Sequence, residues 1–393
     1  RLPVGEIFSA EGIPYVRIVD FYNTFIDIDN VQLISDKLHK LLERYQIKNK
    51  DILLTIVGNT VGLIGYNQLT LDKINFTENC ARIRTKSLLP EYLLTVLLSQ
   101  IGQQQVSRER VGTAQPKLSL DRLRRFLVPI TSNTFQLTIK SYVDESLKLI
   151  NESKTFYTQA EDLLLEELGL KDFQVEDDLS FVVNLSDVKS TNRVDAEYFH
   201  PKFQKLVEQI KKNNAKLLGN LVSMKKGFEP GSEAYQEEGK LFIRVSSLSK
   251  FGVDDKDQKY LNDELYQQLK KDFEPQMGEV LLTKDASPGV AYVVKEPIEG
   301  IISGGILRLK VKDRLDMEYL ALCINSIIGK MQAERDAGGS VIAHWKPEQI
   351  KHMLIPVLPK STQEKIADLV RKSHEARKKS KELLEEAKRK VEE

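Results

Sequence analysis

The sequence predicts an α+β fold built as a tandem, pseudo-symmetric repeat: two mixed α/β modules joined by two long helices that form an antiparallel coiled coil. Three observations predict it. Sequence segments recur at one constant offset of 227 residues. Each copy mixes β-like runs with helical stretches but lacks a regular βαβ alternation, which is typical of α+β modules. A long helix with a coiled-coil pattern follows each copy.

The repeat covers more than a hundred residues at low identity. "YVRIVDF" at 15–21 matches "FIRVSSL" at 242–248, and "PEYLL" at 90–94 matches "MEYLA" at 317–321. Single residues keep the same offset: Gly102 with Gly329, Gly112 with Gly339, and Pro129 with Pro356. Because one offset holds throughout, the chain is interpreted as a tandem duplication.

Each module follows one plan. An alternating β-like run is followed by a polar helical stretch, then by a buried strand, a glycine-containing turn and a partner strand. One helix is expected next, at 91–106 in the first copy and at 318–332 in the second. Each module closes with a loop that leads into a short amphipathic segment and an apolar exit with a proline, at 111–130 and 337–357.

The helix after each module carries seam residues at alternating three- and four-residue steps, which is the spacing of a coiled coil. Since neither helix could hide this seam alone, the two helices are expected to pair; the alternative is that each packs back on its own module. The expected seam positions are Ile139, Val143, Ser146, Ile150, Ser153, Tyr157, Ala160 and Leu164 in one helix, and Ile366, Val370, Ser373, Arg377, Ser380, Leu384, Ala387 and Val391 in the other.

These patterns divide the chain into four parts: a first module at 1–130, a central helix at 131–168, a second module at 169–357 and a C-terminal helix at 358–393. Residues 171–226 have no counterpart in the first copy. We therefore expect the native chain to carry roughly fifty or more residues ahead of Arg1 that resemble them.

Catalytic motifs are missing from the sequence. It contains no phosphate-binding G-x-x-x-x-G-K-[ST] loop, no G-x-G-x-x-G after a strand and no Pro-Pro pair, and its five histidines lack metal-ligand spacing. We expect no catalytic residues, no metal and no cofactor, and therefore a binding protein that is not an enzyme. No apolar window is long enough for a membrane span, and two isolated cysteines favour buried free thiols in the cytoplasm.

Four stretches in this order resemble the DNA-specificity (S) subunits of type I restriction-modification systems: "GIPYVRIVDF", "KDILLTIVGNTVGLIG", "GTAQPKLSLDRLRRFLVPI" and "RVDAEYFHPKF". The resemblance implies that each module is a target-recognition domain for one half of a bipartite site in double-stranded DNA. It also implies that the helices set the spacing and dock two methyltransferase subunits, which restriction subunits join. Two alternatives stay open: the recognition portion of a larger fused restriction-methyltransferase, and a structural adaptor that binds protein.

Candidate DNA contacts lie in exposed turns, where polar side chains can reach base edges. In the first module they are Asn59, Thr60, Thr113, Gln115 and Lys117; in the second they are Lys284, Asp285, Ser287, Ser340, His344 and Lys346. The alternative for each is a polar group of an ordinary solvent-facing turn. Arg17 and Arg244 share one repeat position, and each is expected either to face DNA or to form a structural pair. The lone Trp345 is expected to be a core anchor rather than a base-stacking wedge.

Overall fold

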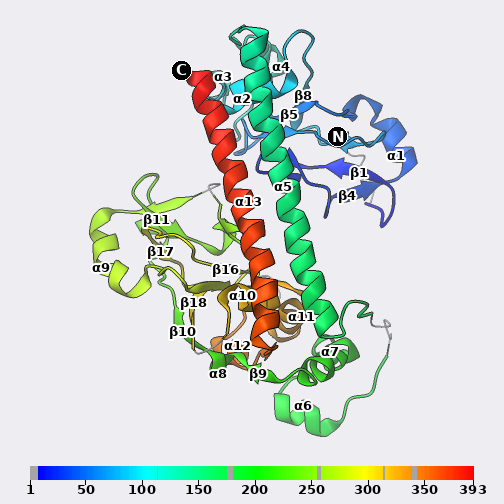
Figure 1. Cartoon of the computed structure of the whole chain (residues 1–393), viewed down its shortest axis with the longest axis vertical. Helices are drawn as coiled ribbons and strands as arrows, with labels where there is room; N and C mark the ends of the chain where they lie inside the picture. Colours follow the sequence, from blue (N-terminus) through cyan, green and yellow to red (C-terminus); the bar gives the residue numbers. More distant parts are fainter. Residues whose placement is uncertain (1–7, 113, 175–179, 255–257, 313–314, 339–342) are drawn as a thin grey trace. The chain divides into compact units, whose positions relative to one another are not determined.

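The computed structural model describes residues 8–112, 114–174, 180–254, 258–312, 315–338 and 343–393. It divides into two compact units. Unit 1 comprises Arg1–Glu152 with Ala376–Glu393, and unit 2 comprises Ser153–Glu375 (Figure 1). The long helices α5 (Asn133–Glu167) and α13 (Lys360–Glu392) contribute residues to both units.

Unit 1 contains two sheets, with strand orders β4-β1-β7 and β2-β3-β6-β5-β8. Its strands are β1 (Ile13–Val16), β2 (Phe21–Tyr22), β3 (Phe25–Ile26), β4 (Gln32–Ile34), β5 (Ile52–Thr55), β6 (Ile64–Tyr66), β7 (Asn75–Phe76) and β8 (Cys80–Ile83). Its shorter helices are η1 (Ile18–Asp20), α1 (Asp36–Leu41), η2 (Glu43–Tyr45), α2 (Pro90–Leu98), α3 (Gln100–Glu109) and α4 (Leu120–Leu123). Strand β5 is buried along its whole length, which places it in the core.

Unit 2 contains sheets of order β10-β18-β15-β16 and β14-β11-β17, with two smaller pairs, β12-β13 and β19-β9. Its strands are β9 (Ala215–Leu217), β10 (Val222–Lys226), β11 (Lys240–Ile243), β12 (Leu248–Ser249), β13 (Gly252–Val253), β14 (Lys259–Leu261), β15 (Val280–Thr283), β16 (Ala291–Val293), β17 (Gly300–Ile302), β18 (Ile306–Val311) and β19 (Leu354–Pro356). Its shorter helices are α6 (Leu185–Thr191), η3 (Ala196–Phe199), α7 (Pro201–Lys211), α8 (Leu218–Leu221), η4 (Ser232–Ala234), η5 (Val245–Ser247), α9 (Asp263–Phe273), α10 (Met317–Asn325), α11 (Ile327–Asp336) and α12 (Pro347–Lys351).

The two units confirm the predicted repeat in their hydrogen bonds as well as in their order of elements. Strand β1 pairs antiparallel with β4 and parallel with β7, and β11 pairs in the same way with β14 and β17. The Tyr92 hydroxyl donates to the Pro129 carbonyl at 3.0 Å, and the equivalent Tyr319 hydroxyl donates to the Pro356 carbonyl at 2.9 Å. The proline exit that recurs in the two copies is therefore part of the scaffold in both units.

A glutamine ties each long helix to its own module. Gln136 Oε1 of α5 accepts from the backbone N–H of Leu89 at 3.0 Å, just ahead of α2. Gln363 Oε1 of α13 accepts from the backbone N–H of Asp316 at 3.1 Å, just ahead of α10. Both glutamines are buried, so the start of each long helix is fixed on the module that precedes it.

The prediction of one continuous helix at 91–106, and of its equivalent at 318–332, is wrong, because two helices occupy each stretch. The break falls at Ser99 and at Ser326, where the backbone is extended. The apolar pattern runs on through both breaks and therefore hides them. A glycine three residues later lets the second helix approach the first, since a Cβ at Gly102 would lie 2.4 Å from the Leu97 carbonyl oxygen and one at Gly329 would lie 2.1 Å from that of Ile324.

The predicted coiled-coil seam is confirmed. All sixteen expected positions are buried except Val391, which is half-buried. In unit 1, Ser146 Oγ of α5 lies 2.7 Å from Ser380 Oγ of α13. Ile139, seven residues before Ser146, shares an apolar cluster with Ala387, seven residues after Ser380. The helices are therefore antiparallel.

The seam continues in unit 2, where Ser153 Oγ of α5 lies 3.0 Å from Ser373 Oγ of α13. The helices also pack on their own modules, because Val143 shares a cluster with Leu94 in unit 1 and Val370 shares one with Tyr319 in unit 2. The two expected arrangements, helix on helix and helix on module, therefore coexist.

The segment without a counterpart in the first copy forms the elements from α6 to β10. Strand β10 pairs with β18 and strand β9 pairs with β19. Among the described residues of unit 1, the equivalent strand β8 lies at the edge of its sheet.

Both cysteines are buried and free, and burial raises the pKa of each thiol, Cys80 and Cys323, to about 12. Among the helices in the described part of the chain, none combines the length and the apolar character needed to cross a lipid bilayer.

Replacing Ser146 by leucine should destabilise the helix pair, because the hydroxyl bond to Ser380 is lost and a larger side chain enters a closed seam. We expect the free energy of unfolding, measured by urea denaturation of the full chain, to fall by about 1–3 kcal/mol. Ser141→Leu is the matched control, since Ser141 is exposed on the same helix. Equal effects of the two substitutions would contradict the assigned seam.

Replacing Gly329 by alanine should also destabilise the protein. Helix propensity alone would favour alanine by up to about 1 kcal/mol. The clash with the Ile324 carbonyl opposes this gain, and overpacking of this kind costs about 1–3 kcal/mol. Urea denaturation should show a net loss, whereas Gly338→Ala, with no atom within 4 Å of the new Cβ, should stay near the wild-type value. A stabilised Gly329→Ala variant would refute the close approach.

Candidate nucleic-acid interface

In unit 1 the turn after β5 lies against the loop that closes the module. The Gly58 backbone N–H donates to the Pro116 carbonyl at 2.8 Å, and the Leu118 N–H donates to the Ile56 carbonyl at 2.9 Å. Lys117 and Val111 exchange backbone hydrogen bonds and close the second loop. Residues 56–60 with 111–112 and 114–118 are called loop pair 1.

Unit 2 contains the same arrangement after β15. The Ala286 N–H donates to the Ala343 carbonyl at 2.9 Å, and the Trp345 N–H donates to the Lys284 carbonyl at 2.8 Å. His344 and Gly338 exchange backbone hydrogen bonds, as Lys117 and Val111 do in unit 1. Residues 284–287 with Gly338 and 343–345 are called loop pair 2.

A buried threonine holds the turn in each loop pair. Thr283 Oγ1 donates to the Ser287 carbonyl at 2.5 Å and accepts from the Val290 N–H at 2.9 Å. Thr55 Oγ1 contacts the Thr60 carbonyl and accepts from the Leu63 N–H at 3.0 Å. The backbone of the two loop pairs is thus alike, while their projecting side chains differ.

Most of the described candidates are exposed: Asn59, Thr60, Gln115 and Lys117 around loop pair 1, and Ser287, His344 and Lys346 around loop pair 2. Thr113 and Ser340 lie outside the described residues. The sequence places the turn and the closing loop of each module far apart, and the fold brings them together.

Lys284 corrects the expectation of an exposed side chain. Its side chain is 11% exposed, and its ammonium group lies 2.5 Å from Asp285 Oδ2. Oδ1 of the same carboxylate lies 2.8 Å from His344 Nδ1. Partial burial acts to raise the pKa of Asp285, but the hydrogen bonds from Lys284 and His344 outweigh it and hold that pKa below its usual range. Asp285 is therefore an anion that joins two candidate residues.

Arg17 and Arg244 each interact with the residue three positions later in their own turns, Asp20 and Ser247. The Arg17 guanidinium pairs with Asp20 at 3.1 Å within its own turn. Of the two roles expected for Arg17, contact with DNA or a structural pair, this bond fits the structural pair. Arg244 has a serine at the equivalent place, and the Ser247 hydroxyl lies 3.1 Å from its backbone nitrogen. The two arginines thus share a backbone position but have different partners.

Trp345 is a core anchor, as expected. It is fully buried, and it occupies the repeat position of Leu118, which is 1% exposed. Each anchor follows directly on an exposed candidate, Lys117 or His344. The anchors hold the loops in place while the preceding side chains face outward.

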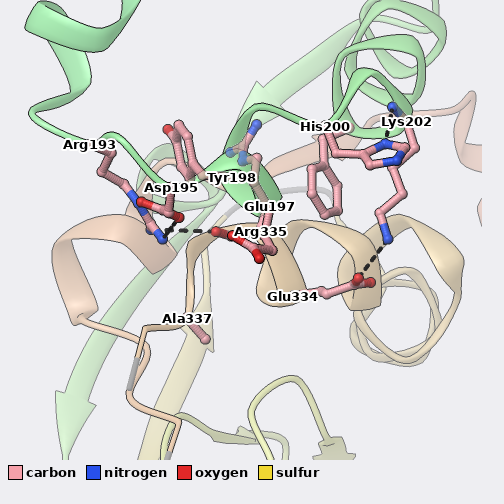
Figure 2. A pocket seen from close by; sticks show the side chains of 10 residues that line it. Arg193, Asp195, Glu197, Tyr198, His200, Lys202, Glu334, Arg335 and Ala337 are labelled. Atoms are coloured by element: carbon pink, nitrogen blue, oxygen red, sulfur yellow. Dashed lines mark hydrogen bonds and ion pairs between the residues drawn. The ribbon is translucent and has the colours of Figure 1, made fainter. Parts of the chain in front are cut away.

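A small pocket of about 180 Å³ in unit 2 was missed from the sequence (Figure 2). The Tyr198 ring lies 4.3 Å from the guanidinium of Arg193 and 5.6 Å from that of Arg335. Its cations have carboxylate partners, such as Asp195 for Arg193. The motif "RVDAEYFHPKF" supplies most of the lining, and its dense charge was the available signal. Because Arg193, Lys202 and Arg335 each pair with a carboxylate of this chain, we assign the pocket a structural role.

No group of three or more histidine, cysteine, aspartate or glutamate side chains that could hold a metal ion occurs among the residues that the structure describes.

Comparison with known proteins identifies the family. The sequence model of the type I restriction modification DNA specificity domain matches residues 4–156 and 210–388. The type I restriction enzyme EcoBI specificity subunit of Escherichia coli is 28% identical over 137 residues, which is 34% of this chain and 28% of that protein. The match therefore spans little more than a quarter of this relative.

Two solved structures are similar over most of both chains. The S subunit of the type I restriction-modification system of M. genitalium has 14% identity and a TM-score of 0.42, with 98% of this chain and 90% of that chain covered. The HsdS subunit of Thermoanaerobacter tengcongensis has 15% identity and a TM-score of 0.31, with coverages of 97% and 89%. Because the family model matches both repeats, the chain belongs to the type I restriction-modification DNA specificity family.

Proposed function

We propose that this chain is the non-catalytic DNA specificity subunit of a type I restriction-modification complex, acting in the cytoplasm without a cofactor of its own. The module at 1–130 reads one half of a bipartite double-stranded site, and the module at 169–357 reads the other. The helices at 131–168 and 358–393 set the spacing and dock two methyltransferase subunits, which restriction subunits join. One observation carries the proposal: two loop pairs share a backbone and differ in their exposed side chains.

The chemistry of the loop pairs supports base reading. Asn59 and Gln115 carry amides that can donate and accept, as recognition of adenine requires, and Lys117 can donate to guanine. In the second module, Ser287, His344 and Lys346 offer a different set of donors and acceptors. Different side chains on like backbones would give two half-sites of different sequence. The same role extends to Thr60, Thr113 and Ser340, with Arg17, Arg244, Lys284 and Asp285 acting closer to the scaffold.

The helix pair suits a spacer. Helix α5 has 35 residues and α13 has 33, and each would extend about 50 Å at 1.5 Å per residue. Their seam is filled, and their remaining charged faces are open to partner subunits. A net charge of +1 is low for a freestanding DNA-binding protein. Partner subunits would then supply much of the phosphate neutralisation.

Exchanging residues 1–130 for the same module of a relative should change one half of the recognised site and leave the other half intact. Binding-site selection from randomised duplexes, with the chain assembled with its methyltransferase subunits, measures the outcome. The matched control exchanges 169–357 and should change the opposite half. Changes in both halves, or in neither, would contradict independent reading.

Lengthening both long helices by one heptad, between Ser146 and Ser153 in α5 and between Ser373 and Ser380 in α13, should keep the seam aligned. Seven residues add about 10.5 Å, which corresponds to roughly three base pairs at 3.4 Å each. The selected site should keep both half-sequences and gain about three base pairs between them. Inserting the heptad in one helix alone misaligns the serine pairs and should impair assembly. An unchanged spacer in the double insertion would refute the role of the helices.

A further inference from the structure

We propose that Asp285 fixes the tautomer of His344, so that the imidazole selects a base carrying an exocyclic amino group, adenine or cytosine, in the second half-site. The inference rests on the proposed function and names the class of base that one residue reads. Asp285 is then a positioning residue, and His344 is the residue that contacts DNA.

The tautomer follows from the bonding of the carboxylate. Asp285 is ionised and holds the Lys284 ammonium on Oδ2 at 2.5 Å, so it has no proton to give. Oδ1 lies 2.8 Å from His344 Nδ1, and a carboxylate can only accept a hydrogen bond. Nδ1 must therefore carry the hydrogen. In the neutral imidazole the other nitrogen, Nε2, is left as an acceptor.

The loop holds this pair in a defined position. Asp285 and His344 form an isolated β-bridge outside the strands, and their neighbours Ala286 and Ala343 are joined by a backbone hydrogen bond of 2.9 Å. Ala286 has a φ of 58°, a left-handed conformation that non-glycine residues adopt at a cost, and Gly58 takes the equivalent place in unit 1. Strained backbone of this kind is concentrated at functional sites.

The protein backbone packs closely against one side of the carboxylate, at Gly305. A Cβ added to Gly305 would lie 3.4 Å from Asp285 Oδ2 and 2.7 Å from a methyl group of Val245, so a larger residue would clash with Val245 next to the acid. In contrast, the His344 side chain is 61% exposed. The imidazole is thus fixed at Nδ1 and open over most of its remaining surface.

An acceptor and a donor select different bases in the major groove. Adenine N6 and cytosine N4 are amino donors there, whereas guanine O6 and N7 and thymine O4 only accept. Nε2 as an acceptor therefore matches adenine or cytosine. In unit 1, Lys117 occupies the repeat position of His344, and an ammonium group only donates. The two half-sites should differ in this respect, with an amino base opposite His344 and a base of the guanine type opposite Lys117.

The substitution Asp285→Asn tests the inference, because Lys284 determines which way the new amide group points. An ammonium group has only donors, so the amide oxygen of the new asparagine should turn to Lys284 and its NH₂ group to His344. Nδ1 then becomes the acceptor, and the hydrogen moves to Nε2. The variant keeps the size of the side chain while it reverses the polarity of the exposed nitrogen.

Two measurements follow on the full chain, each at a pH of about 8.5, two units above the pKa of a free imidazole. Nitrogen-15 NMR of histidine-labelled protein should report Nδ1–H in the wild type and Nε2–H in Asp285→Asn. Binding-site selection by the complex with its methyltransferase subunits should show one position of the second half-site losing its preference for an amino donor and gaining one for an acceptor, guanine above all, since guanine presents two acceptors in the major groove. The preference should shift by about tenfold, within the range of one good base contact. The first half-site should stay the same.

The control Asp285→Ala removes the acceptor without replacing it, and it should weaken the preference at that position without reversing it. An Nε2–H tautomer in the wild type would overturn the inference. So would a uniform loss of affinity for all sequences in Asp285→Asn, which would indicate a phosphate contact. If the wild-type complex selects no bipartite sequence at all, both the proposed function and the proposed contact of His344 with a base are wrong. The NMR measurement decides the tautomer of His344 independently of that result.

Discussion

The seam between α5 and α13 is the constraint on which the rest of the structure depends. Each helix carries an apolar stripe whose exposure to water would be unfavourable, and each buries this stripe against the other helix. Buried serine pairs, Ser146 with Ser380 and Ser153 with Ser373, let the helices approach closely and give their hydroxyls partners inside the seam. Gln136 and Gln363 then fix each module to the start of its helix.

On this scaffold, the residues that support the backbone are the same in both modules, while the exposed side chains of the loops differ. The tyrosine that bonds the proline exit, the glycine that lets two helices touch, and the buried threonine of each turn recur in both units. The exposed side chains differ, with Lys117 in unit 1 and His344, paired with Asp285, in unit 2. A duplicated support with diverged surface side chains is the arrangement that the proposed reading of two different half-sites requires.

Much of this fold could be predicted because it depends on periodicity. The three- and four-residue steps place the seam residues, and the constant offset reveals the repeat. The breaks at Ser99 and Ser326 could not be predicted, since the apolar pattern continues across them and the bends depend on Gly102 and Gly329 meeting a neighbouring helix.

The candidate site was predictable only in part, for a similar reason. Glycine turns and polar residues indicate which loops project, but they do not say which side chains meet. Asp285 and His344 are 59 residues apart and become partners only through the backbone hydrogen bonds that join the two loops. The burial of Lys284 follows from the same contact.

The account is tested most directly by the pattern of bases that the wild-type complex selects. Randomised duplexes would be bound by the full chain with its methyltransferase subunits, recovered and sequenced. The account predicts two short specific blocks of different sequence, separated by a spacer of fixed length and no base preference. A single continuous block, two identical blocks or no enriched sequence would contradict it.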